Sequence, residues 1–348
     1  MLELTTNPGL EDVVLDELRF RIAPATVTGE MRFDGLAGHV RVTADLDADA
    51  LRDAALALRS VHRAVRPLGT FEVPREDPLG AIQRAVAGFA GPLPELSPDV
   101  SFRVRCKRLG THAFTSEDVE RAAGAGVRDV LPRRVRLKDP DVVLRVDVRD
   151  DVGRVGVALA PASWSRRSTG PFRPTTSLRA NLAWGLLAIA RPLDGPPPGR
   201  LLDPFVGAGT ILSEAVATWP GVEAWGSDLQ ARCAEGAREN LGDRAVVRTG
   251  DARRLGDVWP EGGVDTVVTN LPFGRRMGKA TDLAALYAAF LAGALAVTTP
   301  NARLVAMTED RAAFNRALGR QHGWQTRHVR IVEIGAIYAG VFVLSRGS

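Results

Sequence analysis

Two short segments in the C-terminal half of the chain place polar side chains beside glycine or proline turns. They are Asp203-Pro-Phe-Val-Gly-Ala-Gly-Thr210 and Asn270-Leu-Pro-Phe273. An apolar strand that ends in a glycine turn and opens a helix is how a doubly wound sheet builds a nucleotide pocket. An amide followed by a proline-stiffened turn and an aromatic ring suits a planar base that carries an amine. Together the segments predict methyl transfer from S-adenosylmethionine to an amine of a nucleobase.

The cofactor half of this prediction rests on three acids at successive strand ends, Asp203, Asp228 and Asp251. Ligands of open α/β sheets bind beyond the carboxyl ends of the strands. Asp228 lies about 20 residues past the glycine turn, the spacing at which an acid binds ribose hydroxyls, and Asp251 is placed to accept from an adenine amine. A single acid has a simpler alternative, since Asp228 is also a good cap for a helix starting at Leu229.

The second segment offers two acceptors to an exocyclic amine, whose lone pair is delocalised into its ring. The Asn270 side chain supplies one carbonyl and the Leu271 backbone supplies the other. Pro272 stiffens the turn, and Phe273 provides a ring on which an extruded base can stack. The structural alternative is an ordinary strand-to-loop turn with a core phenylalanine.

Other chemistries find less support in the sequence. A dinucleotide fingerprint would place a third glycine where Leu212 stands, which argues against hydride transfer. The five histidines show no metal spacing, and Cys106 and Cys233 are isolated, so no metal is expected. The lack of a signal peptide, of a long apolar run and of paired cysteines favours a reduced, cytoplasmic location.

The elements that must position these residues alternate regularly from residue 201 onward. Strands are expected at 201–203, 223–228, 245–249, 264–270 and 303–307, separated by helices at 210–217, 229–241, 283–297 and 311–318. Such alternation predicts a parallel sheet with helices on both faces. Two final strands, 326–333 and 337–344, should pair antiparallel and close one edge.

The N-terminal residues form shorter elements that suit an α+β sandwich. A helix is expected over residues 8–19, with Asn7 as its N-cap and Pro8 in its first turn. Residues 101–107 should form a strand with alternating faces, and residues 142–148 and 154–159 a hairpin. A further helix, 177–190, precedes a proline-rich connector at 196–199.

Charge is distributed unevenly along the 348 residues. Residues 1–100 carry 10 basic and 16 acidic side chains, residues 101–174 carry 16 and 9, and the remainder carries 19 and 16. The net charges are therefore −6, +7 and +3. A polyanion such as a nucleic acid is expected to bind the middle segment.

The motifs resemble those of a known family. The extended segments, Asp203-Pro-Phe-Val-Gly-Ala-Gly-Thr-Ile-Leu-Ser-Glu214 and Asn270-Leu-Pro-Phe-Gly274, resemble class I methyltransferases acting on exocyclic amines. The stretches Arg173-Pro-Thr-Thr-Ser-Leu-Arg-Ala-Asn-Leu-Ala183, Thr6-Asn-Pro-Gly-Leu-Glu-Asp12 and Val332-Glu-Ile-Gly-Ala-Ile-Tyr338 resemble THUMP-containing RNA methyltransferases. The closest resemblance is to tRNA guanosine-N2 methyltransferases that modify position 6 of the acceptor stem. That family usually has Asn/Asp-Pro-Pro-Phe/Tyr, and Leu271 replaces the first proline.

The resemblance implies an α/β protein with four parts: a ferredoxin-like domain at 1–65, a THUMP domain at 66–162, a linker at 163–176 and a Rossmann-like methyltransferase domain at 177–348. It implies a catalytic segment made of Asn270, Leu271, Pro272 and Phe273. The implied contacts of S-adenosyl-L-methionine are Thr175, Thr176, Ser177, Asp203, Phe205, Gly207, Gly209, Thr210, Asp228, Leu229, Asp251, Ala252 and Asn270.

The partner implied by the resemblance is tRNA, bound by a monomeric enzyme at the acceptor stem and 3′ end. The candidate RNA contacts are Arg103, Arg105, Lys107, Arg133, Arg134, Arg136, Arg166 and Arg275. Four alternatives stay open at this stage: a 23S rRNA guanine-N2 enzyme, a tRNA enzyme for another guanosine, a DNA adenine-N6 methyltransferase and an RNA-binding protein with an inactive methyltransferase domain.

Overall fold

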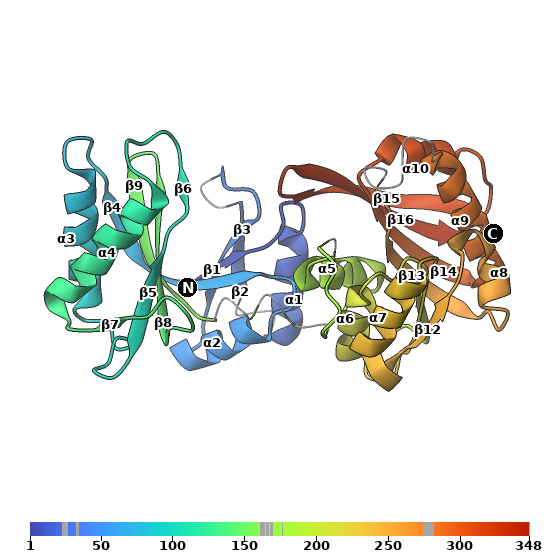
Figure 1. The fold of residues 1–348 in the computed structure, drawn as a ribbon, viewed down its shortest axis with the longest axis horizontal. Coiled ribbons are helices and arrows are strands. Elements are labelled where there is room, and N and C mark those ends of the chain that lie inside the picture. Colours follow the sequence, from blue (N-terminus) through green and yellow to red (C-terminus); the bar gives the residue numbers. More distant parts are fainter. Residues whose placement is uncertain are drawn as a thin grey trace.

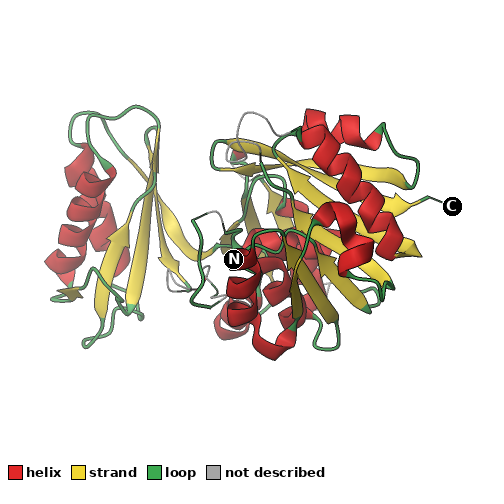
Figure 2. Cartoon of the chain, turned by 45° about the vertical axis from the view of Figure 1, so that its right-hand side comes forward, coloured by secondary structure: helices red, strands yellow, loops and turns green. Residues whose placement is uncertain are grey.

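The protein folds around two large β-sheets that lie at opposite ends of an elongated molecule (Figures 1 and 2). The computed structural model describes residues 1–22, 27–32, 35–160, 164, 167, 170–175, 177–273 and 282–347. The Thr176, Arg166 and Arg275 side chains, predicted to contact cofactor or RNA, lie outside these residues.

The N-terminal sheet contains nine strands among the described residues, in the order β2-β3-β1-β4-β9-β8-β5-β7, with β6 paired to β8. These strands are β1 (Leu2–Thr5), β2 (Val27–Met31), β3 (His39–Ala44), β4 (Arg63–Glu72), β5 (Ser101–Arg105), β6 (Arg108–Leu109), β7 (Arg134–Val135), β8 (Val142–Arg149) and β9 (Val152–Ala158). The predicted hairpin is the antiparallel pair β8–β9.

Four helices pack on this sheet: α1 (Glu11–Arg21), α2 (Ala48–Ala57), α3 (Pro78–Ala90) and α4 (Ser116–Val130). Short polar side chains accept from backbone amides at three of their starts, as N-caps do. Asp47 caps α2, Asp77 caps α3, and Thr115 forms a reciprocal capping box with Asp118 at α4. Helices α1 and α2 pack in one apolar cluster with β1 and β3, whereas α3 and α4 pack in another with β5, β8 and β9.

Strand β4 joins the two halves of the N-terminal sheet. Its first residues pair with β1, and residues Val65–Glu72 pair with β9. The expected boundary between residues 65 and 66 therefore lies inside a continuous strand, and the division into separate domains stays a prediction. Because backbone hydrogen bonds run across β4 on both sides, the two halves are held in one sheet.

The C-terminal sheet has the order β12-β11-β10-β13-β14-β16-β15. Its strands are β10 (Arg200–Asp203), β11 (Glu223–Asp228), β12 (Val246–Thr249), β13 (Val264–Asn270), β14 (Thr298–Thr308), β15 (Trp324–Ile334) and β16 (Ile337–Arg346). The first five are parallel, and β16 pairs antiparallel with both β14 and β15. The predicted parallel sheet with an antiparallel edge is confirmed.

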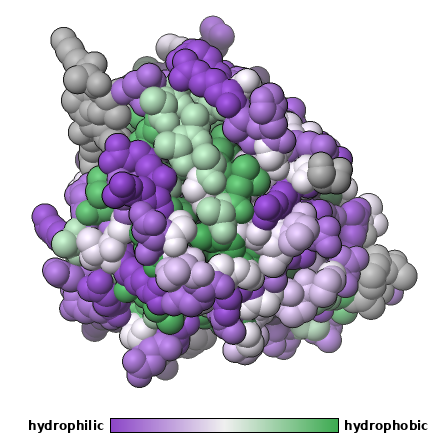
Figure 3. Space-filling model, turned by 90° about the vertical axis from the view of Figure 1, so that its right-hand side faces the viewer, coloured by the Kyte–Doolittle hydropathy of each residue, from purple (hydrophilic) through white to green (hydrophobic). Residues whose placement is uncertain are grey.

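Six α-helices surround this sheet among the described residues: α5 (Ala180–Ala190), α6 (Thr210–Thr218), α7 (Ala231–Leu241), α8 (Leu255–Val258), α9 (Leu283–Val297) and α10 (Arg311–Leu318). Helix α9 is apolar nearly all round, and alanines such as Ala285, Ala292 and Ala296 take its exposed positions. Figure 3 shows apolar surface gathered at this end of the molecule. None of the helices in the described ranges is long and apolar enough to cross a membrane.

The predicted role of Asn7 is wrong. Helix α1 begins at Glu11, its N-cap position is Leu10, and no side chain caps it. The Asn7 amide instead donates to the Glu333 carbonyl at 2.9 Å and accepts from Asn181 at 2.9 Å. A capping pattern reads only local sequence, whereas Asn7 is held by residues more than 170 positions away in the C-terminal part.

The segment around Asn7 forms the junction between the two parts of the molecule. Arg330 on β15 makes two 2.8 Å contacts with the Asp12 carboxylate and a third to the Gly9 carbonyl at 3.1 Å. A Cβ at Gly9 would lie 2.1 Å from the Ile331 carbonyl oxygen, so only glycine permits this approach. Leu10 and Val13 are buried in the core of the C-terminal part. This junction fixes the N-terminal sheet against the C-terminal one.

Candidate active site

The candidate site lies where the strand order of the C-terminal sheet reverses. From β10 the chain proceeds outward to β11 and β12 on one side, then crosses to β13 and β14 on the other. A crevice forms at the carboxyl ends of strands that flank such a switch point. Asp203, Asp228 and Asn270 are the last residues of β10, β11 and β13. The structure therefore brings three of the predicted side chains to one edge of the sheet.

Asp203 is the most deeply buried acid of the site, with 2% of its surface exposed. Its Oδ1 accepts from the Thr269 hydroxyl at 2.7 Å and from the Phe205 amide at 3.2 Å. Burial raises the pKa of Asp203 to about 7, and the nearby Asp228 charge adds to the rise, against the two hydrogen bonds. Burying this ionisable group lowers the stability of the fold. Its presence in place of an apolar side chain indicates a role in binding.

The glycine turn provides a bare stretch of backbone beside Asp228. Gly207 and Gly209 both have positive φ, at 52° and 80°. A Cβ at Gly207 would meet nothing nearer than the Phe205 carbonyl at 3.9 Å, whereas one at Gly209 would lie 2.9 Å from Leu241. Gly209 is thus needed for helix packing, and Gly207 leaves open space in which a ligand can lie against the backbone.

Asp228 organises this turn from the neighbouring strand. Its two carboxylate oxygens accept from the Gly207 amide at 3.1 Å and from the Gln230 amide at 2.9 Å. Burial raises its pKa. Helix α7 begins at Ala231 rather than at Leu229, which is 63% exposed. Asp228 therefore serves the local turn, and its half-buried carboxylate still has acceptor capacity for a ligand.

Asp251 lies after β12, where its carboxylate is already engaged. It accepts from the Arg253 backbone at 2.9 Å and forms an ion pair with the Arg253 guanidinium at 2.6 Å. The Arg253 side-chain hydrogen bonds lower the pKa of Asp251. An adenine amine at this position would share the carboxylate with Arg253. The adjacent Ala252 is buried.

The side-chain oxygen of Asn270 is an unsatisfied polar atom at the end of β13. Its Oδ1 is buried and has no hydrogen-bond partner among the described residues. An unpaired buried acceptor costs on the order of 1–3 kcal/mol. A donor supplied by a ligand would remove that cost, and an exocyclic amine is such a donor.

The turn after Asn270 is held by a tyrosine that the sequence analysis missed. The buried Tyr287 hydroxyl donates to the Pro272 carbonyl at 2.8 Å and lies 3.1 Å from the Thr308 hydroxyl. Burial raises the pKa of Tyr287, so it stays a neutral donor. Tyr287 lies on α9, and no local signal links it to a turn 15 residues earlier. Phe273 follows this turn and is half-buried.

Comparisons with known proteins identify the domains of the chain. A family model described as THUMP domain matches residues 90–158, and one described as RMKL-like, methyltransferase domain matches residues 167–339. The chain is 39% identical over 357 residues to the tRNA (guanine(6)-N2)-methyltransferase of Thermus thermophilus, covering 99% of each protein. The chain belongs to the family of THUMP-containing methyltransferases.

One solved structure and a second relative support this membership. The crystal structure of TrmN from Thermus thermophilus matches with a TM-score of 0.81 and 38% identity, covering 99% of each chain. A human tRNA (guanine(6)-N(2))-methyltransferase, THUMP3, is 33% identical over 72% of this chain and 52% of its own length. The structure of the methyltransferase SMU.472 complexed with SAH matches at 18% identity and a TM-score of 0.74, which shows the fold alone. The resemblance inferred from the sequence motifs is confirmed.

The departure of Leu271 from the family pattern has a structural consequence. Its side chain is 1% exposed and lies in the core. Its backbone amide donates to the Met307 carbonyl at 2.9 Å, which continues the contact between β13 and β14 past Asn270. Proline has no amide hydrogen and cannot make this bond. In this member of the family, the bond holds Asn270 from its C-terminal side.

Asn240 holds the segment before α5 beside the glycine turn. It is a second residue of the site that the sequence did not predict. The Asn240 amide donates to the carbonyls of Phe172 and Ala208, and its oxygen accepts from the Phe172 amide. The Ser177 hydroxyl donates to the nearby Pro174 carbonyl, and Thr175 is exposed. Thr175 and Ser177 thus lie on a segment anchored to the cofactor turn, and their predicted cofactor contacts stay predictions.

The predicted RNA contacts differ in how they are used within the fold. Arg103 and Arg133 donate to the backbone carbonyls of Leu137 and Leu96. The other described candidates have exposed side chains on the THUMP half of the N-terminal sheet: Arg105, Lys107, Arg134 and Arg136. The exposed group is the better placed to reach a phosphate backbone.

Proposed function

We propose that the protein transfers a methyl group from S-adenosyl-L-methionine to the exocyclic N2 of a guanosine in tRNA, at position 6 of the acceptor stem. The observation that carries the chemistry is the buried, unpaired Asn270 oxygen at the sheet switch point. The relative that matches over 99% of both chains bears the name of this activity, which supports the choice of nucleotide.

The residues at the crevice fit the proposed cofactor. Open space above Gly207 suits a ligand that carries no phosphate, and Asp228 retains acceptor capacity for ribose hydroxyls. Asp203 and Asp251 offer carboxylates at the two neighbouring strand ends. When bound, S-adenosylmethionine supplies an electrophilic methyl group. These side chains would hold it, with Phe205, Gly209, Thr210, Leu229 and Ala252 around them.

The catalytic turn would act by positioning the amine. The Asn270 oxygen accepts one N–H, which directs the nitrogen lone pair and stabilises the positive charge that develops on the nitrogen. Tyr287 holds the Pro272 carbonyl, and the Leu271 amide holds the start of the turn. Phe273 offers a ring against which an extruded guanine can stack. The residues thus assist by orientation and electrostatics.

The proposed RNA partner is supported by the THUMP match and by the charge of the middle segment. Residues 101–174 carry a net charge of +7. Recognition through phosphates and shape suits an A-form stem, whose deep major groove side chains cannot read. The monomeric state and the cytoplasmic location stay predictions.

The test is methyl transfer from labelled S-adenosylmethionine to unmodified tRNA and, separately, to unmodified rRNA, with mass spectrometry of the product nucleoside. We expect N2-methylguanosine at position 6 of tRNA. Product in rRNA would keep the chemistry and refute the substrate. Cofactor binding without any product would point to another acceptor or to a missing partner.

The assigned role of Asn270 is tested with Asn270→Ala. Loss of one positioned hydrogen-bonding group in other enzymes lowers turnover about 100-fold or more, and we expect a similar fall in kcat. The matched control is Asn301→Ala, which removes an exposed asparagine on β14. Equal turnover in the two variants would contradict the role of Asn270.

A further inference from the structure

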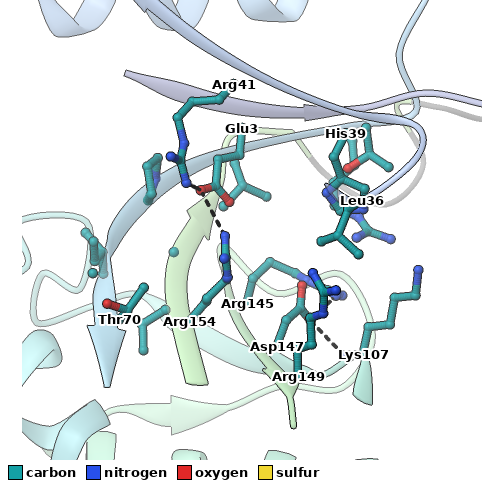
Figure 4. Close-up of a pocket in the computed structure, with 18 of the residues that line it drawn as sticks. Glu3, Leu36, His39, Arg41, Thr70, Lys107, Arg145, Asp147, Arg149 and Arg154 are labelled. Carbon is teal, nitrogen blue, oxygen red and sulfur yellow. Dashed lines mark hydrogen bonds and ion pairs between the residues drawn. The ribbon is translucent and has the colours of Figure 1, made fainter. Parts of the chain in front are cut away.

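A second concave site lies far from the methyltransferase crevice, on the N-terminal sheet. A cavity of about 240 Å³ opens across β1, β3, β4, β8 and β9, where the two halves of the sheet meet (Figure 4). Along β8, Leu144 and Val146 pack toward α3 and α4, and the alternate residues Arg145 and Asp147 face the cavity. The cavity therefore lies on the face away from the helices.

The cavity wall carries more positive than negative charge. Two carboxylates, Glu3 and Asp147, face six cationic side chains: Arg41, Arg63, Lys107, Arg145, Arg149 and Arg154. Glu3 is already paired with Arg41 at 3.4 Å and with Arg154 at 3.9 Å, and Asp147 is paired with Arg145. Figure 4 shows Glu3, Arg41, Arg145 and Arg154 converging from separate strands.

The side chains of two of the cations make no ion pair with a carboxylate of the described residues, although the Lys107 backbone amide donates to Asp147 at 2.7 Å. The side chains of Arg63 and Lys107 make no ion pair or hydrogen bond with any other described residue, and the Arg145 Nε is buried without a partner. Arg63 is half-buried, and burial lowers its pKa; the nearby Arg145 charge adds to this effect and the Asp147 charge opposes it. An external anion would stabilise such a group further.

The titration of the neighbouring groups reflects the same positive field. Burial, together with the charges of Lys107 and Arg63, lowers the pKa of His39 to about 4. Burial and Arg63 likewise lower the pKa of His62 to about 4. Both histidines are therefore neutral at physiological pH, and the remaining arginines still exceed the carboxylates.

We propose that this cavity is a binding site for a phosphate group, held by Arg63, Lys107 and Arg145. Arginine and lysine donors suit phosphate oxygens, which accept several charge-assisted hydrogen bonds at once. The cavity is smaller than typical sites for whole drug-sized ligands, and a phosphate with part of its sugar fits that size. Two sources share this chemistry: a phosphate of the RNA substrate and a free phosphate-bearing small molecule. Only the RNA source rests on the function proposed above.

The site is tested first without catalysis, by calorimetric titration of the full chain with inorganic phosphate and with pyrophosphate at constant ionic strength. Hydrogen bonds to charged groups correspond to about tenfold or more in affinity. We therefore expect Arg63→Gln and Lys107→Gln each to weaken binding at least about tenfold. The control, Arg128→Gln, removes an exposed arginine on α4 and should bind as the unaltered protein does. No binding, or equal binding by all variants, would overturn the proposal.

A folding defect is not expected, because neither substitution removes an ion pair or a side-chain hydrogen bond to another described residue. We expect both variants to unfold at or above the temperature of the unaltered protein. Methylation assays then separate the two sources. If RNA supplies the phosphate, Arg63→Gln raises KM for tRNA and leaves kcat unchanged, and pyrophosphate competes with tRNA. An unchanged KM, together with lost phosphate binding, supports a free small molecule and refutes the RNA source.

Discussion

Replacing Asp203 by asparagine should stabilise the cofactor-free protein, and the gain should grow with pH. Asparagine has nearly the same shape, and its Oδ1 can still accept from Thr269 and Phe205. What disappears is the ionisable group, whose pKa burial raises to about 7 from an ordinary 3.8. A folded-state pKa above the unfolded value stabilises the fold below the unfolded pKa, and this contribution disappears as pH rises through 7.

The size of the effect follows from the two pKa values. Between pH 5 and pH 8 the unaltered protein should lose roughly 2–3 kcal/mol of unfolding free energy through Asp203 alone. Asp228, with a raised pKa, acts in the same direction, and His39 and His62, with lowered pKa values, act in the opposite one. These three groups are present in both proteins, so the difference between variant and unaltered protein reports Asp203 together with its coupling to Asp228.

The assay is urea unfolding of both proteins without cofactor at pH 5, 6, 7 and 8. We expect the free-energy difference to change progressively in favour of the variant as pH rises. Asp243→Asn, at an exposed carboxylate, is the control and should give a flat difference. A flat or inverted profile for Asp203→Asn would refute the claim that this acid is kept at a cost to stability. The same variant should bind S-adenosylmethionine more weakly, because the Asp203 carboxylate is proposed to hold the cofactor.

Three further predictions concern the contacts that position the site. Tyr287→Phe leaves the Pro272 carbonyl without its donor, so kcat in single-turnover methylation should fall about tenfold while cofactor affinity is kept; an unchanged kcat would remove its positioning role. Asn240→Ala releases Phe172 from the glycine turn, so calorimetry should show about tenfold weaker cofactor binding and unaltered tRNA binding; a change only in tRNA binding would contradict this reasoning. Arg330→Met removes the pair with Asp12, a partly exposed contact, and should lower the unfolding free energy by about 1 kcal/mol and raise KM for tRNA; if the defect appears only in cofactor affinity, the junction does not serve RNA positioning.

Local sequence was sufficient for the elements that carry the chemistry. The periodicity of residues 201–344 predicted the parallel sheet and its antiparallel edge. The signals for each strand and helix lie within short stretches of neighbouring residues. Asp203, Asp228 and Asn270 were found for the same reason, since each follows its strand directly. The short strand β2 and helix α8 were not predicted, as their few residues carry too little pattern.

The local sequence pattern gave a wrong prediction at Asn7, because contacts with distant residues determine its role. Asn7 has the sequence context of a helix cap, yet its amide is bound by Asn181 and Glu333 across the junction. The predicted boundary between residues 65 and 66 lies within β4, whose hydrogen bonds to β1 and β9 hold both halves in one sheet, and the division into domains stays a prediction. A local sequence pattern does not show which distant residue will bond to a polar side chain or which strand will pair with an edge.

The sequence alone determined the chemistry at the strand ends, namely the acids, the glycine turn and the Asn270 segment. Each of these features consists of residues that are close together in the sequence. Only the tertiary structure decided how these groups are held. Thr269 meets Asp203 across 66 positions, and Asn240 meets Phe172 across 68. The phosphate cavity gathers side chains from Glu3 to Arg154. Burial, and with it the raised pKa of Asp203 and the unpaired state of Asn270 and Arg63, exists only after those distant segments have packed together.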